Sequence, residues 1–216
     1  MDKHFKAALF DLDGVVFDTE PQYSVFWGAQ GNEFHPEMPD FASRIKGQTL
    51  TQIYEGYFSG PLECERGRIT RRLEDFEQRM EFNYIPGFEL FVRSLRSQNI
   101  RTAVVTSSNQ AKMESVYRAR PEFRCYFDAI LTAEDFAFSK PHPDCYQKAA
   151  LYFDVQADEC IVFEDSFNGI KSGISAGMRV IGLSTTNSPE SIAPLSSLVI
   201  PDFQRLTVSQ CTELLR

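Results

Sequence analysis

The chain of 216 residues has few cysteines and histidines, and neither kind is grouped. Its five cysteines are scattered without a Cys-x-x-Cys pair, and its histidines lie far apart at His4, His35 and His142. A disulfide framework, a thiolate metal centre and a histidine zinc site are therefore not expected. Scattered cysteines in an odd number are typical of a reducing compartment, so we expect a cytoplasmic protein.

Long apolar runs and basic blocks are missing as well. No run approaches the roughly 20 residues that cross a bilayer, and the N-terminus lacks the charged-then-apolar pattern of a secretion signal. Lys+Arg 22 against Asp+Glu 30 gives a net charge of -8, which repels a phosphodiester backbone. We expect no membrane and no nucleic acid as partner, and an anionic ligand would need a local cationic site. Without a coiled-coil heptad, a monomer is the default expectation.

Short apolar runs alternate with helical patterns along most of the chain. Six runs suit strands buried on both faces, at 7–10, 102–105, 129–131, 160–163, 180–183 and 198–200. Apolar residues spaced at i, i+3, i+4 and i+7 predict helices between them, at 88–95, 144–153 and 166–176. This alternation implies an α/β fold, with a parallel sheet covered by helices on both faces.

The segment from about Glu20 to Tyr84 contains helical patterns and no convincing strand. Its best stripe consists of Ile69, Leu73, Phe76 and Met80. Turn and breaker residues flank the segment, with Pro21 at its start and Ile85-Pro86-Gly87 at its end. We predict a helical domain at 19–85, inserted into a sheet domain made of 1–18 and 86–216. The alternative is one long helical excursion packed rigidly on the sheet.

Carboxylates follow two of the predicted strands. Asp11 and Asp13 come directly after the first strand, and Glu164 and Asp165 come directly after the fourth. Ligands of open parallel sheets bind outside the carboxyl edge, and clustered carboxylates need a cation or a shared proton. Their oxygens suit Mg²⁺. The alternatives are solvated acidic loops and, at Asp165 or Ser166, a simple helix N-cap.

Residues suited to an anion stand at the ends of other strands. Thr106-Ser107-Ser108-Asn109 follows the second strand and offers hydroxyls and backbone amides to a phosphate. Lys140 precedes Pro141 and Pro143, which stiffen the chain around its ammonium group. Helix capping and a solvated lysine are the alternatives. The shared position at strand ends favours an anion site beside the carboxylates.

These motifs resemble the haloacid dehalogenase (HAD) superfamily, in its branch of small sugar-phosphate phosphatases and β-phosphoglucomutases. The resemblance covers nearly the whole chain. Its motifs are DLDGVVFDTE at 11–20, VVTSS at 104–108, KPHPDCY at 140–146 and EDSFNGIKSGISAGM at 164–178. The resemblance implies a Rossmann-like core, a type 1 helical cap at the inserted segment, and a small phosphorylated metabolite as substrate.

The resemblance also implies a role for each motif residue. Asp11 would attack phosphorus and form an aspartyl-phosphate, while Asp13 would protonate the leaving oxygen and then activate water. The implied Mg²⁺ ligands are the Asp11 carboxylate, the Asp13 main-chain carbonyl, Asp165, and Glu164 directly or through water. The implied phosphate ligands are Thr106, the Ser107 amide and Lys140. A dehalogenase, which uses no metal, would leave the Glu-Asp pair without a purpose.

The cap of such enzymes selects the substrate. The candidate residues here are Glu20, Tyr23, Lys46, Gln48 and Thr49, and ordinary packing is the alternative for Tyr23, Gln48 and Thr49. Tyr23 stands where β-phosphoglucomutases carry a histidine, and Thr49 or Leu50 stands where they carry an arginine for a second phosphate. We therefore expect a Mg²⁺-dependent phosphatase that hydrolyses a small phosphomonoester. The alternatives are a phosphomutase and a catalytically silent binding protein with this fold.

Overall fold

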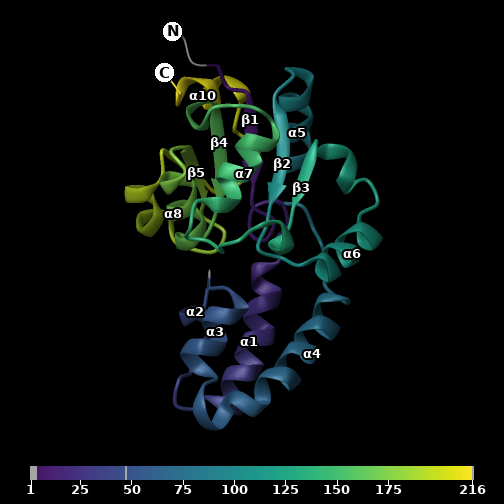
Figure 1. The fold of residues 1–216 in the computed structure, drawn as a ribbon, viewed down its shortest axis with the longest axis vertical. Coiled ribbons are helices and arrows are strands. Elements are labelled where there is room, and N and C mark those ends of the chain that lie inside the picture. The colour runs from purple at the N-terminus through teal and green to yellow at the C-terminus, as the bar shows by residue number, and fades with distance from the viewer. Residues whose placement is uncertain (1–3, 47, 216) are drawn as a thin grey trace.

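The computed structural model describes residues 4–46 and 48–215, and in them six parallel strands form one sheet in the order β3-β2-β1-β4-β5-β6 (Figure 1). The strands are β1 (Ala7–Phe10), β2 (Arg101–Val105), β3 (Ala129–Leu131), β4 (Cys160–Glu164), β5 (Arg179–Leu183) and β6 (Leu198–Ile200). All six predicted strands are present, and three are one residue longer than predicted. The predicted α/β fold is confirmed.

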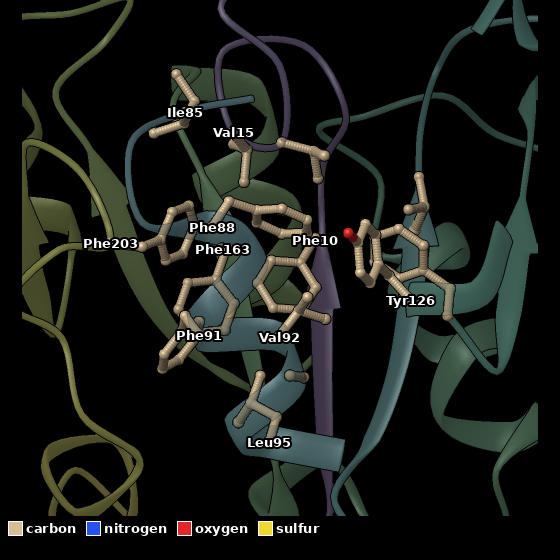
Figure 2. Close-up of a cluster of buried hydrophobic side chains, with 14 of the residues drawn as sticks. Phe10, Val15, Ile85, Phe88, Phe91, Val92, Leu95, Tyr126, Phe163 and Phe203 are labelled. Atoms are coloured by element: carbon tan, nitrogen blue, oxygen red, sulfur yellow. The ribbon is translucent and has the colours of Figure 1, made fainter. Parts of the chain in front are cut away.

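Helices cover both faces of the sheet. On one face pack α5 (Phe88–Ser97), α6 (Gln110–Ala119) and α10 (Val208–Glu213), and on the other pack α7 (Asp144–Tyr152), α8 (Phe167–Ser175) and α9 (Pro189–Ile192). Successive residues of β1 enter opposite clusters, so Phe10 faces α5 while Leu9 faces α7 and α8. Figure 2 shows Phe10 stacked on Phe163, with ring centroids 4.5 Å apart. Burial on both faces explains the continuous apolar runs.

Four further helices gather at one end of the sheet (Figure 1). They are α1 (Glu20–Phe34), α2 (Phe41–Arg44), α3 (Leu50–Tyr57) and α4 (Arg66–Glu77). Phe26, Phe41, Phe58 and Ile69 form a hydrophobic cluster of their own there. A separate core is what an inserted domain requires, so this cluster supports a domain division at 19–85, which we retain as a proposal. Residues 1–3, 47 and 216 of that division lie outside the described residues.

The chain enters and leaves the helical segment at the same place. Phe17 and Tyr84 form an isolated antiparallel bridge. The Asp18 amide donates to the Asn83 carbonyl at 2.8 Å, and the Ile85 amide donates to the Val16 carbonyl at 2.9 Å. The two linkers therefore run side by side, as the turn and breaker residues at both ends predict.

The predicted helical stripe is wrong at its last member. Helix α4 ends at Glu77, and its residues Ile69, Leu73 and Phe76 contact the cluster of the helical segment. Met80 lies beyond the helix and is buried in the cluster of the sheet domain instead. Met80 packs the linker against the sheet domain. Its spacing from Phe76 also fits a helix, so the sequence pattern does not reveal that the helix has already ended. Among the described residues, no helix combines the length and apolar character needed to cross a membrane.

Candidate active site at the carboxyl edge of the sheet

The sheet brings three carboxylates together at its carboxyl edge. Asp11 directly follows β1, Glu164 ends β4, and Asp165 follows it; one oxygen of each lies within 4.8 Å of the others. The cause is the register of two neighbouring parallel strands, in which Phe10 lies opposite Phe163. Asp11 and Glu164, the residues after Phe10 and Phe163, therefore stand at the same height at the edge of the sheet.

Lys140 provides a buried cation beside these carboxylates. Its side chain is only 6% exposed, and its Nζ donates to Asp11 Oδ1 at 2.6 Å, to Glu164 Oε1 at 2.6 Å and to the Val105 carbonyl at 3.0 Å. Burial alone would lower the pKa of this ammonium, but Asp11 and Glu164 raise it above its ordinary value. Lys140 therefore stays charged, and it supplies the local cation that an acidic protein needs to bind an anion.

Glu164 is fully buried, and hydrogen-bond donors surround its carboxylate. Oε1 accepts from Lys140 and, at 2.8 Å, from the Tyr146 hydroxyl, while Oε2 accepts from the Asp165 amide and from the Ser166 amide and hydroxyl. A Cβ at Gly169 would overlap this carboxylate, so the glycine in α8 leaves room for it. These contacts hold the Glu164 carboxylate beside Lys140, and it is also a member of the carboxylate cluster with Asp11 and Asp165.

Two of the clustered carboxyls have raised pKa values, mainly because they are buried. Burial raises the pKa of Asp11 to about 7 against the opposing effect of Lys140, and the nearby carboxylates add to the rise. Burial also raises the pKa of Asp165, and the charges of Glu164 and Asp11 raise it further. Hard oxygen donors with surplus negative charge are the ligands that Mg²⁺ prefers, so the residues fit this ion. The backbone at Gly14 adjoins the Asp165 carboxyl, where a Cβ would overlap it.

The Asp13 side chain accepts hydrogen bonds from three donors. Its Oδ1 accepts from the Thr19 hydroxyl at 2.7 Å, and its Oδ2 accepts from the Ser108 hydroxyl at 3.2 Å and from the Lys112 ammonium. The sequence-based reasoning missed Thr19, Ser108 and Lys112 as partners of Asp13. One signal was available for Lys112, because a lysine in the first turn of a helix opposes the helix dipole and needs an acidic partner.

A cavity of about 290 Å³ lies between this edge and the helical segment. From the sheet domain, the predicted residues that line it are Asp11, Asp13, Thr106, Ser107, Lys140 and Asp165. From the helical segment, they are Glu20, Tyr23, Gln48 and Thr49. Lys46 instead lines a smaller neighbouring pocket together with Glu20 and Tyr23, and Glu164 lies behind the cavity wall. Lining residues that the sequence-based reasoning missed include Ile53, Glu74, Glu77, Asn168 and Thr186.

Residues of the loop after β2 have two different roles, because one caps α6 and others line the cavity. Asn109 caps α6 by accepting a hydrogen bond from the Lys112 amide at 2.9 Å. The buried Thr106 hydroxyl accepts from the Ser108 amide at 3.0 Å, and the exposed Ser107 lines the cavity. The capping alternative therefore accounts for Asn109, while Thr106 and Ser107 line the same cavity as Asp11.

Proteins with related sequences include phosphatases and a mutase. A probable pseudouridine-5'-phosphatase of Saccharomyces cerevisiae is 30% identical over 195 residues, which cover 82% of this chain and 81% of that protein. Hexitol phosphatase A of Escherichia coli is 29% identical over 213 residues, which cover 95% of this chain and 94% of that protein. The β-phosphoglucomutase of Bacillus subtilis is 28% identical over 190 residues, with 82% and 83% covered.

Structural and family comparisons agree with these sequences. A crystal structure of a family IA, variant 3 HAD hydrolase from Entamoeba histolytica matches with a TM-score of 0.83 at 23% identity, covering 97% of this chain and 99% of that one. At this identity the match shows the shared fold. A family model described as haloacid dehalogenase-like hydrolase matches residues 5–177. The chain thus belongs to the haloacid dehalogenase-like hydrolase family.

Proposed function

We propose that this protein is a Mg²⁺-dependent phosphatase that hydrolyses a small phosphomonoester, such as a sugar phosphate, through an aspartyl-phosphate on Asp11. The observation that supports it most is the meeting of Asp11, Lys140 and Asp165 at one cavity in a chain of this family. The intact set of residues argues against a catalytically silent binding protein. We also propose a monomer in the cytoplasm, from the scattered cysteines and the absence of a heptad pattern.

The first half of the reaction is attack by Asp11 on phosphorus. A carboxylate can approach a phosphate dianion only when the charge between them is neutralised, and the Lys140 ammonium lies 2.6 Å from the attacking carboxylate. Bound Mg²⁺, held by the Asp11 and Asp165 carboxylates and the Asp13 carbonyl, would supply further neutralisation. Thr106 and Ser107 would orient the phosphoryl oxygens, and the covalent intermediate divides one displacement into two easier ones.

Asp13 serves both halves of the reaction as acid and then base. It would give a proton to the oxygen that leaves with the alcohol product, and it would later take one from the water that attacks phospho-Asp11. Its place next to Asp11 on the loop after β1 puts its carboxyl on the cavity wall. The helical segment covers that cavity, which limits access of bulk water to the intermediate.

The charge of the cavity favours a phosphatase over a phosphomutase. On the helical side, its wall contains the carboxylates Glu20, Glu74 and Glu77. No arginine is among the described residues that line the cavity, and its two lysines, Lys112 and Lys140, are paired with carboxylates. A second phosphate would therefore meet negative charge without a bidentate partner. Incubation with each anomer of glucose 1-phosphate separates the activities, because a phosphatase releases inorganic phosphate and a mutase forms glucose 6-phosphate.

Substitution of Asp11 tests the proposed nucleophile. We expect Asp11→Asn to abolish hydrolysis of 4-nitrophenyl phosphate in the presence of Mg²⁺, because the neutral amide cannot form the covalent bond. Asp13→Asn should keep most of the Mg²⁺-induced rise in melting temperature, since the proposed ligand there is a main-chain oxygen. Asp75→Asn, at an exposed carboxyl of α4, is the matched control and should retain wild-type turnover. Wild-type turnover by Asp11→Asn would exclude the aspartyl-phosphate mechanism.

A further inference from the structure

We infer that Lys112 is a positioning residue that fixes the carboxyl of Asp13 for proton transfer. The inference rests on the proposed function, because it concerns the use of Asp13 as acid and base. It assigns a second lysine to the site, with a task different from that of Lys140. Lys140 contacts the Asp11 nucleophile, whereas Lys112 contacts Asp13.

The location of Lys112 is costly unless the ammonium has a specific partner. Lys112 is 4% exposed and stands in the first turn of α6. A buried charge loses its hydration, and the positive end of the helix dipole repels a cation at this position. The ion pair with Asp13 Oδ2 compensates for both effects. Because the buried ammonium of Lys112 is stable only when it is paired with a carboxylate, the ion pair with Asp13 should persist.

Residues of the helical segment close the other side of Lys112. Its Nζ lies 4.8 Å from the centre of the Tyr23 ring, within the range of a cation–π contact. The Tyr23 hydroxyl donates to Glu77 at 2.8 Å, which fixes the ring over the ammonium. Burial, together with the charges of Asp13 and Glu77, raises the pKa of Tyr23, so the hydroxyl stays neutral. Lys112 thus stands between α1 and Asp13 and has little freedom to turn elsewhere.

Three donors then define one orientation of the Asp13 carboxyl. Thr19 binds Oδ1, while Ser108 and Lys112 bind Oδ2. Lys112 is the charged member, and a charge-assisted hydrogen bond is about twice as strong as a neutral one. A positioned general acid or base contributes about 10²–10⁴-fold to a rate, and this contribution depends on geometry. Loss of Lys112 should therefore reduce proton transfer more than any other step.

The leaving group of the substrate reveals this loss. The ratio kcat/KM covers the steps up to formation of phospho-Asp11. An alkyl phosphate has a poor leaving group and needs the proton from Asp13, whereas 4-nitrophenyl phosphate has a good one and does not. For Lys112→Met we expect kcat/KM to fall about 100-fold with an alkyl phosphate and less than about threefold with 4-nitrophenyl phosphate. Lys112→Arg, which keeps the charge, should recover part of the alkyl phosphate rate.

Two controls separate positioning from a structural role. Lys171→Met, at an exposed lysine of α8, should leave both rates unchanged. If Lys112→Met does not fold, Tyr23→Leu removes the ring that confines the ammonium and should show the same leaving-group dependence. Equal losses with both esters, or no loss with either, would overturn the role of Lys112. A wild-type protein that hydrolyses neither ester would instead disprove the proposed function.

Discussion

Two glycines show how single residues create the space in which the carboxylates stand. A Cβ at Gly169 would overlap the Glu164 carboxyl, and a Cβ at Gly14 would overlap that of Asp165. Gly14 also has a φ of +71°, which side chains disfavour, whereas Gly169 lies in an ordinary helix. At Gly169, therefore, the missing side chain matters because of space and not because of backbone freedom.

Gly169→Ala should damage both stability and catalysis. The added methyl group displaces Glu164, and with it Lys140, so we expect kcat/KM to fall by tenfold or more. Overpacking of this kind costs about 1–3 kcal/mol in the free energy of unfolding. Gly28→Ala in α1 is the control, because nothing lies within 4 Å of its Cβ position, and it should stabilise by about 0.5–1 kcal/mol. Urea unfolding and steady-state kinetics measure the two effects. If Gly169→Ala has the stability and kcat/KM of the wild type, the close contact between the Cβ position of residue 169 and the Glu164 carboxyl is wrong.

The carboxyl of Asp11 should make Mg²⁺ binding depend on pH. Its pKa is raised to about 7 from an ordinary value of 3.8, so the folded, metal-free protein binds this proton more tightly than the unfolded chain. This group therefore lowers the stability of the metal-free protein as pH rises from 3.8 to about 7. Mg²⁺ must displace the same proton, so its apparent affinity should be about tenfold weaker at pH 6 than at pH 8.

Calorimetry tests this competition directly. Titration of Mg²⁺ in buffers of different ionisation enthalpy should reveal more proton release at pH 6 than at pH 8, with Asp11 accounting for nearly one proton of the difference. Asp11→Asn, which has no titratable group at this position, should lose most of that proton release. Equal affinities and no proton release across this range would show that the Asp11 carboxyl holds no proton near pH 7 that Mg²⁺ must displace.

At the scale of elements, the start of α3 decides how Thr49 should be interpreted. Thr49 lines the cavity, but it also forms a capping box with Gln52. The Gln52 amide donates to the Thr49 hydroxyl at 3.3 Å, and the Thr49 amide donates to Gln52 Oε1 at 2.8 Å. The hydroxyl is thus already used to begin a helix, which favours packing and capping over substrate recognition at this residue.

Two substitutions distinguish these roles of Thr49. Thr49→Ala removes the cap and should lower the stability of α3 by about 1 kcal/mol, while Thr49→Ser retains the oxygen and should behave like wild type. Hydrogen exchange of the amides at 50–57 measures the effect. If Thr49→Ala instead raises KM with unchanged exchange, Thr49 contacts the substrate and the capping interpretation is wrong.

The sequence predicts what is local, and it misses contacts made across the fold. The strands could be predicted because burial on both faces leaves continuous apolar runs, such as Ala7–Phe10. Asp11 and Asp165 could be predicted because each stands in a short motif just after a strand, and Lys140 because it stands in a proline-flanked motif just before α7. The partners of Lys112 could not be predicted, since they come from the loop after β1 and from α1. Its place in the first turn of α6 indicates only that it needs an acidic partner. The prediction that Met80 belongs to the helical stripe is wrong because the spacing of apolar residues alone does not show where a helix ends.

At the scale of the whole molecule, the net negative charge of the protein and the acidic side chains of the cavity both disfavour anionic ligands. The net charge is -8, and Glu20, Glu74 and Glu77 add local negative charge at the helical side of the cavity. Burial raises the pKa of Glu20 and of Glu77, whereas Glu74 is exposed. Carboxylates on this wall should therefore disfavour any anionic group beyond the one phosphoryl group bound near Lys140.

A matched series of substrates measures this selection. Glucitol 6-phosphate and 6-phosphogluconate are open chains with the same phosphoryl group, but the second has a carboxylate in place of the hydroxymethyl group at the far end of the molecule. We expect kcat/KM for 6-phosphogluconate to be at least about tenfold lower, because its carboxylate would meet the negatively charged side chains of Glu20, Glu74 and Glu77. Glu20→Gln removes one of these charges and should narrow the gap, whereas Glu190→Gln, at an exposed residue of α9, should not. Equal rates with both substrates would mean that the far end of the substrate does not reach the acidic wall, and substrate choice would then depend on shape instead of charge.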